Sequence, residues 1–168
     1  MVPFDYKVIY FTFEISLTVF AQTDVSKHSK MTEQTLKGYF DGTVSADTLA
    51  SDLKDSQVRT GYVTTSVHVI PISDNGEYPV TRQHLIKLCN DTLRGPLTMI
   101  DLNTVAFALI SSDYFHWDDT TKDGEIVADT LFDWDNPEIN FPLTTDNLQL
   151  WKLYLETGKY TLQADKQK

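Results

Sequence analysis

The segment TMIDLNTVAFALIS, residues 98–111, is the one that we expect to be the most buried in the protein. Thr98, followed by Asp101, is typical of a capping box at the start of a helix. Phe107 departs from the apolar face of such a helix, so a buried strand over residues 105–110 is the alternative. The helix is favoured, because apolar residues recur at helical spacing at Leu102, Val105, Ala106 and Leu109.

Further helices are expected on both sides of this segment, because a capping residue precedes each apolar pattern. A glycine, Gly95 or Gly158, stands where two of them are expected to stop. The expected helices are Thr32–Phe40 with Thr32 as cap, Ala46–Leu53 after Ser45, Thr81–Arg94 with Thr81 as cap, and the final helix from Thr144 to Gly158.

Residues 57–72 change to an alternating pattern, which predicts a strand. The Asn75-Gly76 turn that follows predicts that Glu77–Val80 pairs back as a hairpin. Residues 159–163 are a candidate short edge strand. The fold class is therefore α+β, a mostly helical single domain with a small antiparallel β-hairpin or sheet.

The chain of 168 residues has the size of one domain. Residues 1–30 differ in composition and are expected to be a poorly ordered extension, or to result from an over-early start codon ahead of Met31. A signal peptide is the alternative, disfavoured because Asp5 and Glu14 interrupt the segment. The globular domain is placed at residues 31–163 and a loose tail at 164–168.

The formal net charge of −10 repels phosphate backbones and anionic lipid, so we expect neither a nucleic-acid nor a membrane partner. A basic protein is the partner that such a field attracts. Cys89 is the single cysteine and cannot form an internal disulfide, which favours a small core residue in a cytoplasmic protein.

The sequence contains no motif of a hydrolase nucleophile, a nucleotide-binding loop or a zinc peptidase. His116 has three aspartates nearby, and Asp119-Thr-Thr-Lys-Asp-Gly-Glu resembles the start of a calcium loop. Thr130, however, occupies the position at which an EF-hand requires a bidentate glutamate. We therefore predict no metal, no cofactor and no catalytic residue.

Residues 113–138 contain nine acids and one base, a net formal charge of −8. Residues 124–134 fit a helix or a strand, and a helix is preferred; it would align Glu125, Asp129 and Asp133, whose like charges oppose the helix. A solvated face that aids solubility is one explanation, and partner binding is the other. The candidate partner-binding residues are Asp118, Asp119, Asp123, Glu125, Asp129, Asp133, Asp135, Trp117 and Trp134.

Three segments, SSDYFHWDD at 111–119, LFDWDNPEINFPLT at 131–144 and NLQLWKLYLETGKY at 147–160, give the chain a resemblance to small bacterial immunity proteins. These belong to polymorphic toxin and contact-dependent inhibition systems. The resemblance, over about residues 31–162, implies a protein that covers the active face of a basic toxin, often a nuclease. The alternatives are a housekeeping or regulatory interaction module and, third, an acid-cluster metal hydrolase.

Overall fold

The computed structural model describes residues 30–54, 56–59 and 65–162, and six helices lie within these ranges. Every helix begins after a serine or threonine in extended conformation. The helices are α1 (Glu33–Phe40), α2 (Ala46–Leu53), α3 (Arg82–Arg94), α4 (Met99–Ser111), α5 (Lys122–Asp135) and α6 (Thr145–Thr157). The five expected caps, Thr32, Ser45, Thr81, Thr98 and Thr144, are confirmed, and the expectation of a mostly helical α+β fold is confirmed with them.

The two ambiguous segments are both helical. In α4, the Thr98 hydroxyl accepts from the Asp101 amide at 3.2 Å, and the Asp101 carboxylate accepts from the Thr98 amide at 2.7 Å. Two backbone amides that the helix itself leaves unpaired at its N-terminus thus have acceptors. α4 is not the most buried segment, since α5 buries seven residues against six. α5 occupies an equally internal position because it packs against α3, α4 and α6.

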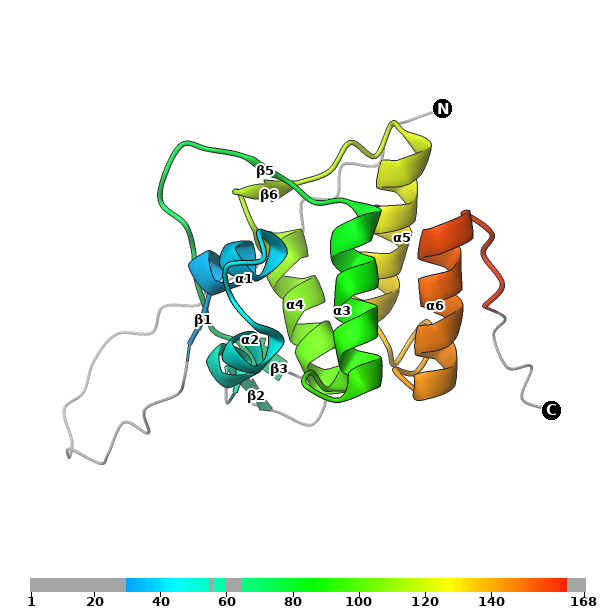
Figure 1. The fold of residues 1–168 in the computed structure, drawn as a ribbon, viewed down its shortest axis with the longest axis horizontal. Helices are drawn as coiled ribbons and strands as arrows, with labels where there is room; N and C mark the ends of the chain where they lie inside the picture. The colour runs from blue at the N-terminus through cyan, green and yellow to red at the C-terminus, as the bar shows by residue number, and fades with distance from the viewer. Residues whose placement is uncertain (1–29, 55, 60–64, 163–168) are drawn as a thin grey trace, which may run out of the picture.

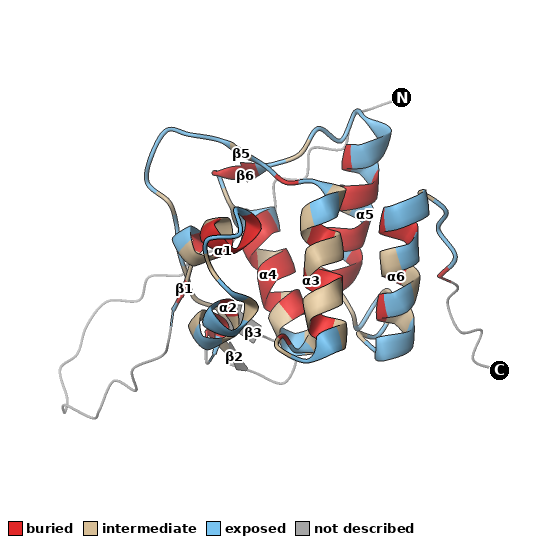
Figure 2. Ribbon diagram, viewed as in Figure 1, coloured by how far each residue is buried: buried red, intermediate tan, exposed pale blue. Residues whose placement is uncertain are grey.

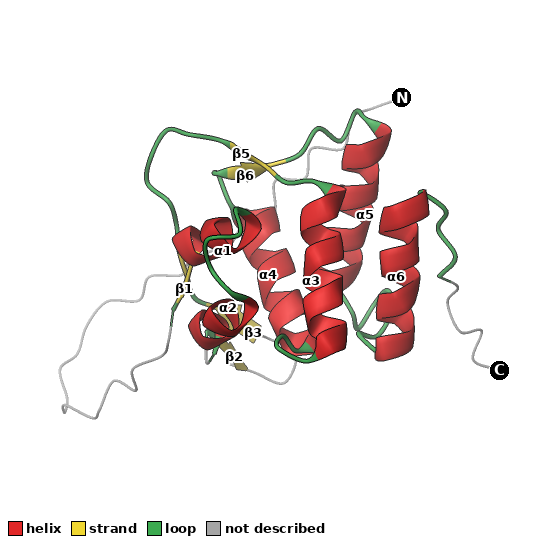
Figure 3. Ribbon diagram, in the orientation of Figure 1, coloured by secondary structure: helices red, strands yellow, loops and turns green. Residues whose placement is uncertain are grey.

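The strands are short and differ from the expected hairpin (Figure 3). β1 (Met31–Thr32) pairs with β4 (Val69–Ile70) in parallel, and β5 (Tyr78–Pro79) pairs with β6 (Phe115–His116) in parallel. β2 (Gln57–Arg59) and β3 (Thr65–Val67) form the one antiparallel pair in the described part of the chain. Residues 57–72 are therefore not one continuous strand.

The expected pairing of Glu77–Val80 with the preceding strand is wrong. The Tyr78 amide donates instead to the Tyr114 carbonyl, and the Val80 amide donates to the His116 carbonyl, both at 2.8 Å. This register brings the Tyr78 ring to 5.6 Å from that of Phe115, so the parallel pair is supported by an aromatic contact that a local hairpin would lack. Residues 159–162 form no strand, and the rest of that candidate lies outside the described residues.

Helices α3, α4, α5 and α6 lie side by side and run alternately up and down (Figure 1). α1 and α2 pack at one side of this group, and the β5–β6 pair crosses one of its ends. The buried faces of the helices point inward (Figure 2). One hydrophobic cluster contains side chains from all six of these helices and extends from Met31 to Leu162.

Two details of the core concern residues singled out in the sequence. Cys89 is buried, which confirms it as a core residue, and burial raises the pKa of its thiol. Gly124 lies where a Cβ atom would be 1.9 Å from the Asp118 carbonyl oxygen, so a glycine is required for the preceding loop to pack on α5. The expected extension before Met31 and the tail after residue 163 fall outside the described residues, Lys30 apart.

Candidate functional site

The loop before α5 is held by its own polar side chains. The Asp118 carboxylate accepts from the Thr120 hydroxyl at 2.5 Å and from the Thr120 amide at 3.1 Å, and these bonds lower the pKa of Asp118. The Thr121 hydroxyl donates to the Asp118 carbonyl and accepts from the Gly124 amide. Thr121 is thus the cap of α5, which begins within the calcium-like stretch at Lys122.

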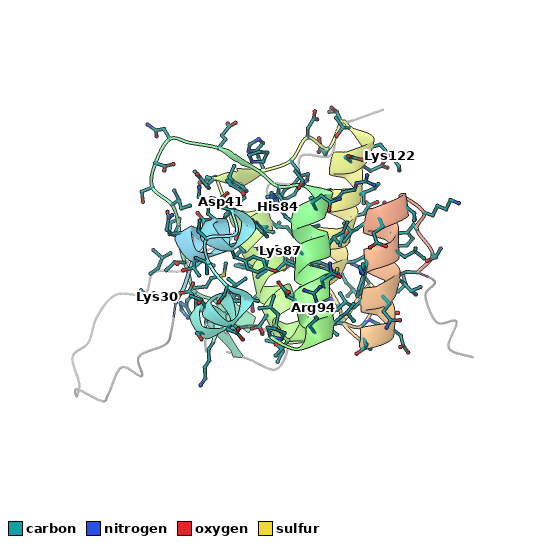
Figure 4. All side chains as sticks on the ribbon, viewed as in Figure 1. Lys30, Asp41, His84, Lys87, Arg94 and Lys122 are labelled. Carbon is teal, nitrogen blue, oxygen red and sulfur yellow. The ribbon has the colours of Figure 1, made fainter. Side chains whose placement is uncertain are left out.

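Five of the candidate acids are exposed, in the loop before α5 and along the first part of this helix. Asp123 pairs with Arg82 at 3.3 Å, and Glu125 pairs with Lys122 at 2.8 Å. Lys122 is at the N-terminal end of α5 (Figure 4), so its charge offsets only that end. We call the five exposed acids the acidic surface: Asp118, Asp119, Asp123, Glu125 and Asp129.

Glu125, Asp129 and Asp133, which we call the acidic stripe, lie along α5, and part of this stripe faces α6. The Asp129 carboxylate accepts from the Tyr154 hydroxyl at 2.7 Å. The Asp133 carboxylate, whose residue is only 6% exposed, accepts from the Trp151 indole at 2.9 Å and from the Tyr160 hydroxyl at 2.7 Å. Two of its three carboxylates, those of Asp129 and Asp133, therefore have hydrogen-bond donors on α6 and on the segment after it, which offsets part of the repulsion between like charges on this helix.

Both tyrosines that donate to the stripe have a raised pKa, caused first by burial and then by the hydrogen bond to the aspartate. A neutral phenol is the form that can donate this bond. The contact is therefore made by neutral donors and not by basic side chains. Within the described residues, no lysine, arginine or histidine forms an ion pair with Asp129 or Asp133.

Three other candidates are buried or half-buried. Trp134 is fully buried and packs edge-on against Trp151, with ring centroids 6.4 Å apart, so it belongs to the core and not to a free surface. Trp117 is half-buried. Asp135 is also half-buried, and burial, followed by the charge of Glu138, raises the pKa of its carboxyl group.

The structure adds two residues that were not among the candidates. Phe132 is 53% exposed and Tyr160 is 43% exposed, and together with Asp129 and Asp133 they line an open hollow of about 220 Å³. Phe132 could have been found from its position three residues after Asp129 on a helix. Tyr160 could not, because it follows α6 and no local pattern connects it to α5.

A second polar cluster lies near the start of α3, where Figure 4 shows His84 close to Asp41. The Asp41 carboxylate accepts from Lys37 at 2.6 Å and from the Tyr78 hydroxyl at 2.8 Å. Burial and the Asp41 bond raise the pKa of Tyr78 to about 12. His84 stacks on Phe40 at 4.6 Å and caps α3 by accepting from the Thr81 amide, so its ring has a structural role.

In the part of the chain that the structure describes, no three histidine, cysteine, aspartate or glutamate side chains are placed to hold one metal ion. His116, which we considered with its neighbouring aspartates, is exposed in β6. Among the same described residues, no helix has the length and apolar character needed to cross a bilayer.

Comparison of the chain with known protein families, with curated proteins and with solved structures gives no match.

Proposed function

We propose that this protein is a non-enzymatic cytoplasmic binding protein that covers a basic protein partner, in the manner of an immunity protein that blocks the active face of a toxin. The observation that supports it most is the acidic surface, where the carboxylates of Asp119 and Asp129 are exposed and have no basic partner among the described residues. Such a surface attracts a basic cleft and occupies the place of a phosphate substrate.

Charges on a surface and rings within it have different effects on binding. Exposed charges raise the association rate, whereas buried rings lower the dissociation rate. The sequence predicted Trp134 as a partner-binding ring, but Trp134 lies in the core. Phe132 is instead the exposed aromatic residue beside the acids. The proposed binding surface is therefore the acidic surface together with Phe132.

The test is to recover partners from the native host and to measure association rates with a doubly charge-reversed protein, Asp119→Lys with Glu125→Lys. We expect association to slow by roughly tenfold or more at low salt, and added salt to slow the wild-type protein toward the same value. The matched control is Asp47→Lys with Glu77→Lys, also one acid in the first turn of a helix and one in a loop, both exposed.

Two results would contradict the proposal. One is an association rate that the Asp119 and Glu125 reversals leave unchanged for every recovered partner. The other is an equally slow association of the control protein, which would show that the net charge of the protein, and not this surface, sets the association rate. Loss of the partner's own activity on adding the protein would support the immunity type of function; a partner that stays active would leave only an interaction module.

A further inference from the structure

The hollow beside α5 combines two exposed rings with two carboxylates. Asp129, Phe132 and Asp133 come from successive turns of α5, and Tyr160 comes from the segment after α6. Phe132 is 53% exposed. This is a high value for phenylalanine, which is more often buried in the core. The rings and the acids thus come from two elements that meet at one place.

Tyr160 is held in position although it lies outside any helix. Its hydroxyl donates to Asp133 at 2.7 Å, and its ring packs edge-on against Tyr154 with centroids 4.9 Å apart. On a further side it contacts the Phe141 ring at 6.2 Å. The Tyr160 side of the hollow is therefore formed before any ligand arrives, which lowers the entropic cost of binding.

The negative charge beneath the hollow lacks a cation. Asp133 is 6% exposed and accepts from two neutral donors, and a buried carboxylate without a positive partner is unfavourable even when it is hydrogen-bonded. No basic side chain in the described residues pairs with it or with Asp129. A cation that entered the hollow would relieve this cost and would meet the negative faces of the aromatic rings.

We infer that the hollow receives an arginine side chain of the basic partner. A planar guanidinium group stacks on aromatic rings and offers several donors to carboxylates at once, whereas an ammonium group is a compact and strongly hydrated charge. This inference rests on the proposed function and adds to it the place and the kind of residue that is recognised. The hollow would be the anchoring point, and the acids at the start of α5 would guide the partner toward it.

The experiment uses the full chain and a short synthetic peptide of alternating glycine and arginine. Its controls are the same peptide with citrulline, which has the shape of arginine without the charge, and the same peptide with lysine. Binding is followed by NMR from the backbone amides. We expect the arginine peptide to shift the resonances of residues 129–133 and 160 most, the lysine peptide to bind more weakly, and the citrulline peptide not to bind.

Variants then locate the contact. Phe132→Ala removes an exposed ring, and Asp129→Asn removes a charge while keeping an oxygen for the Tyr154 hydroxyl; each should weaken the arginine peptide roughly twofold to fivefold. The matched controls are Ile100→Ala and Asp47→Asn, exposed on α4 and α2. They should leave the affinity unchanged, and all variants should melt near the wild-type temperature.

Equal binding of the arginine and citrulline peptides, or of the arginine and lysine peptides, would overturn the assignment. So would unchanged affinity in both Phe132→Ala and Asp129→Asn. If that happened while Asp119→Lys with Glu125→Lys still slowed association with the recovered partner, the hollow would be ruled out and the proposed function would stand. If peptide binding held but no partner depended on those acids, the proposed function would be wrong instead.

Discussion

His84 shows how one residue can look reactive and yet serve the fold. Its ring stacks on Phe40, and its Nδ1 atom accepts from the Thr81 amide at the start of α3. Burial lowers the pKa of the imidazole, with Lys87 acting in the same direction and Asp41 in the opposite one. The residue is therefore held neutral by its surroundings.

This pKa shift predicts a dependence of stability on pH. Below the ordinary histidine pKa of 6.5, the unfolded chain binds a proton at His84 that the folded chain does not bind until a lower pH. The free energy of unfolding should therefore fall as the pH decreases from about 6.5. Well above that pH neither state binds the proton, so His84 should cause no further change of stability with pH. His84→Gln keeps an acceptor at the capping position and cannot titrate, so its decline should be smaller.

The measurement is urea denaturation of both proteins between about pH 7.5 and about pH 5.5. His116→Gln, which removes an exposed imidazole on β6 and not the one that caps α3, is the control for the substitution itself. Parallel declines of the wild-type protein and His84→Gln would show that the imidazole is not held neutral in the fold.

At the scale of elements, the helices were predictable and the strand pairs were not. Each helix has a local cap and an apolar face within one segment, such as Thr98 with Asp101 for α4. The described strands have two or three residues each, and two of their three pairs join segments that are distant in sequence, as for Tyr78 with Phe115. A turn signal such as Asn75-Gly76 reports only on its neighbours, so it could not indicate that β5 pairs with β6.

The candidate site was predicted in part for the same reason. The density of acids on α5 is visible in the sequence, but whether an acid meets solvent or α6 depends on how two helices pack. Asp119 is exposed, whereas Asp133 is covered by Trp151 and Tyr160. The exposure of the aromatic residues also depends on how the helices pack: Trp134 is buried in the core, whereas Phe132 is exposed.

The seam between α5 and α6 gives a second prediction. Asp133→Ala removes the acceptor of the Trp151 indole, a buried donor, and that of the Tyr160 hydroxyl, so the free energy of unfolding should fall by about 1–3 kcal/mol. Asp133→Asn retains one oxygen acceptor, so its free energy of unfolding should fall by less. Asp119→Ala, which removes an exposed acid in the loop before α5, should change stability by no more than about 0.5 kcal/mol.

Urea denaturation midpoints measure these differences, provided that the slope with denaturant is unchanged. A loss for Asp133→Ala no larger than that for Asp119→Ala would mean that the two hydrogen bonds add nothing to stability. It would also mean that hydrogen bonds to α6 and to Tyr160 do not offset the repulsion between the acids on this side of α5.

At the scale of the whole molecule, the core of the described residues begins at Met31. The side chain of Met31 is fully buried, its amide donates to the His68 carbonyl at 3.0 Å, and its strand pairs with β4. Thr32 then caps α1 and donates its amide to Asp52 at 2.8 Å. The described fold is therefore tied together from this residue onward, across α1, α2 and β4.

This placement predicts the effect of shortening the chain. A protein that begins at Met31 keeps the contacts of Met31 and Thr32 with β4, α1 and α2, because a terminal amino group can still donate to the His68 carbonyl. We expect it to unfold cooperatively with a midpoint close to that of the full chain. By contrast, Met31→Ala in the full chain should lower the free energy of unfolding by about 2–5 kcal/mol, the range for truncating a large buried side chain.

Both effects are measured by urea denaturation followed by tryptophan fluorescence, which reports on Trp134 and Trp151 in the core. Loss of cooperative unfolding in the shortened protein would show that residues 1–30 contribute to the fold and would refute the domain boundary placed at residue 31. A small effect of Met31→Ala would instead show that β1 adds little to the core. Since a folded domain of this size is stable by only about 5–15 kcal/mol, the predicted loss on Met31→Ala is large enough to separate these outcomes.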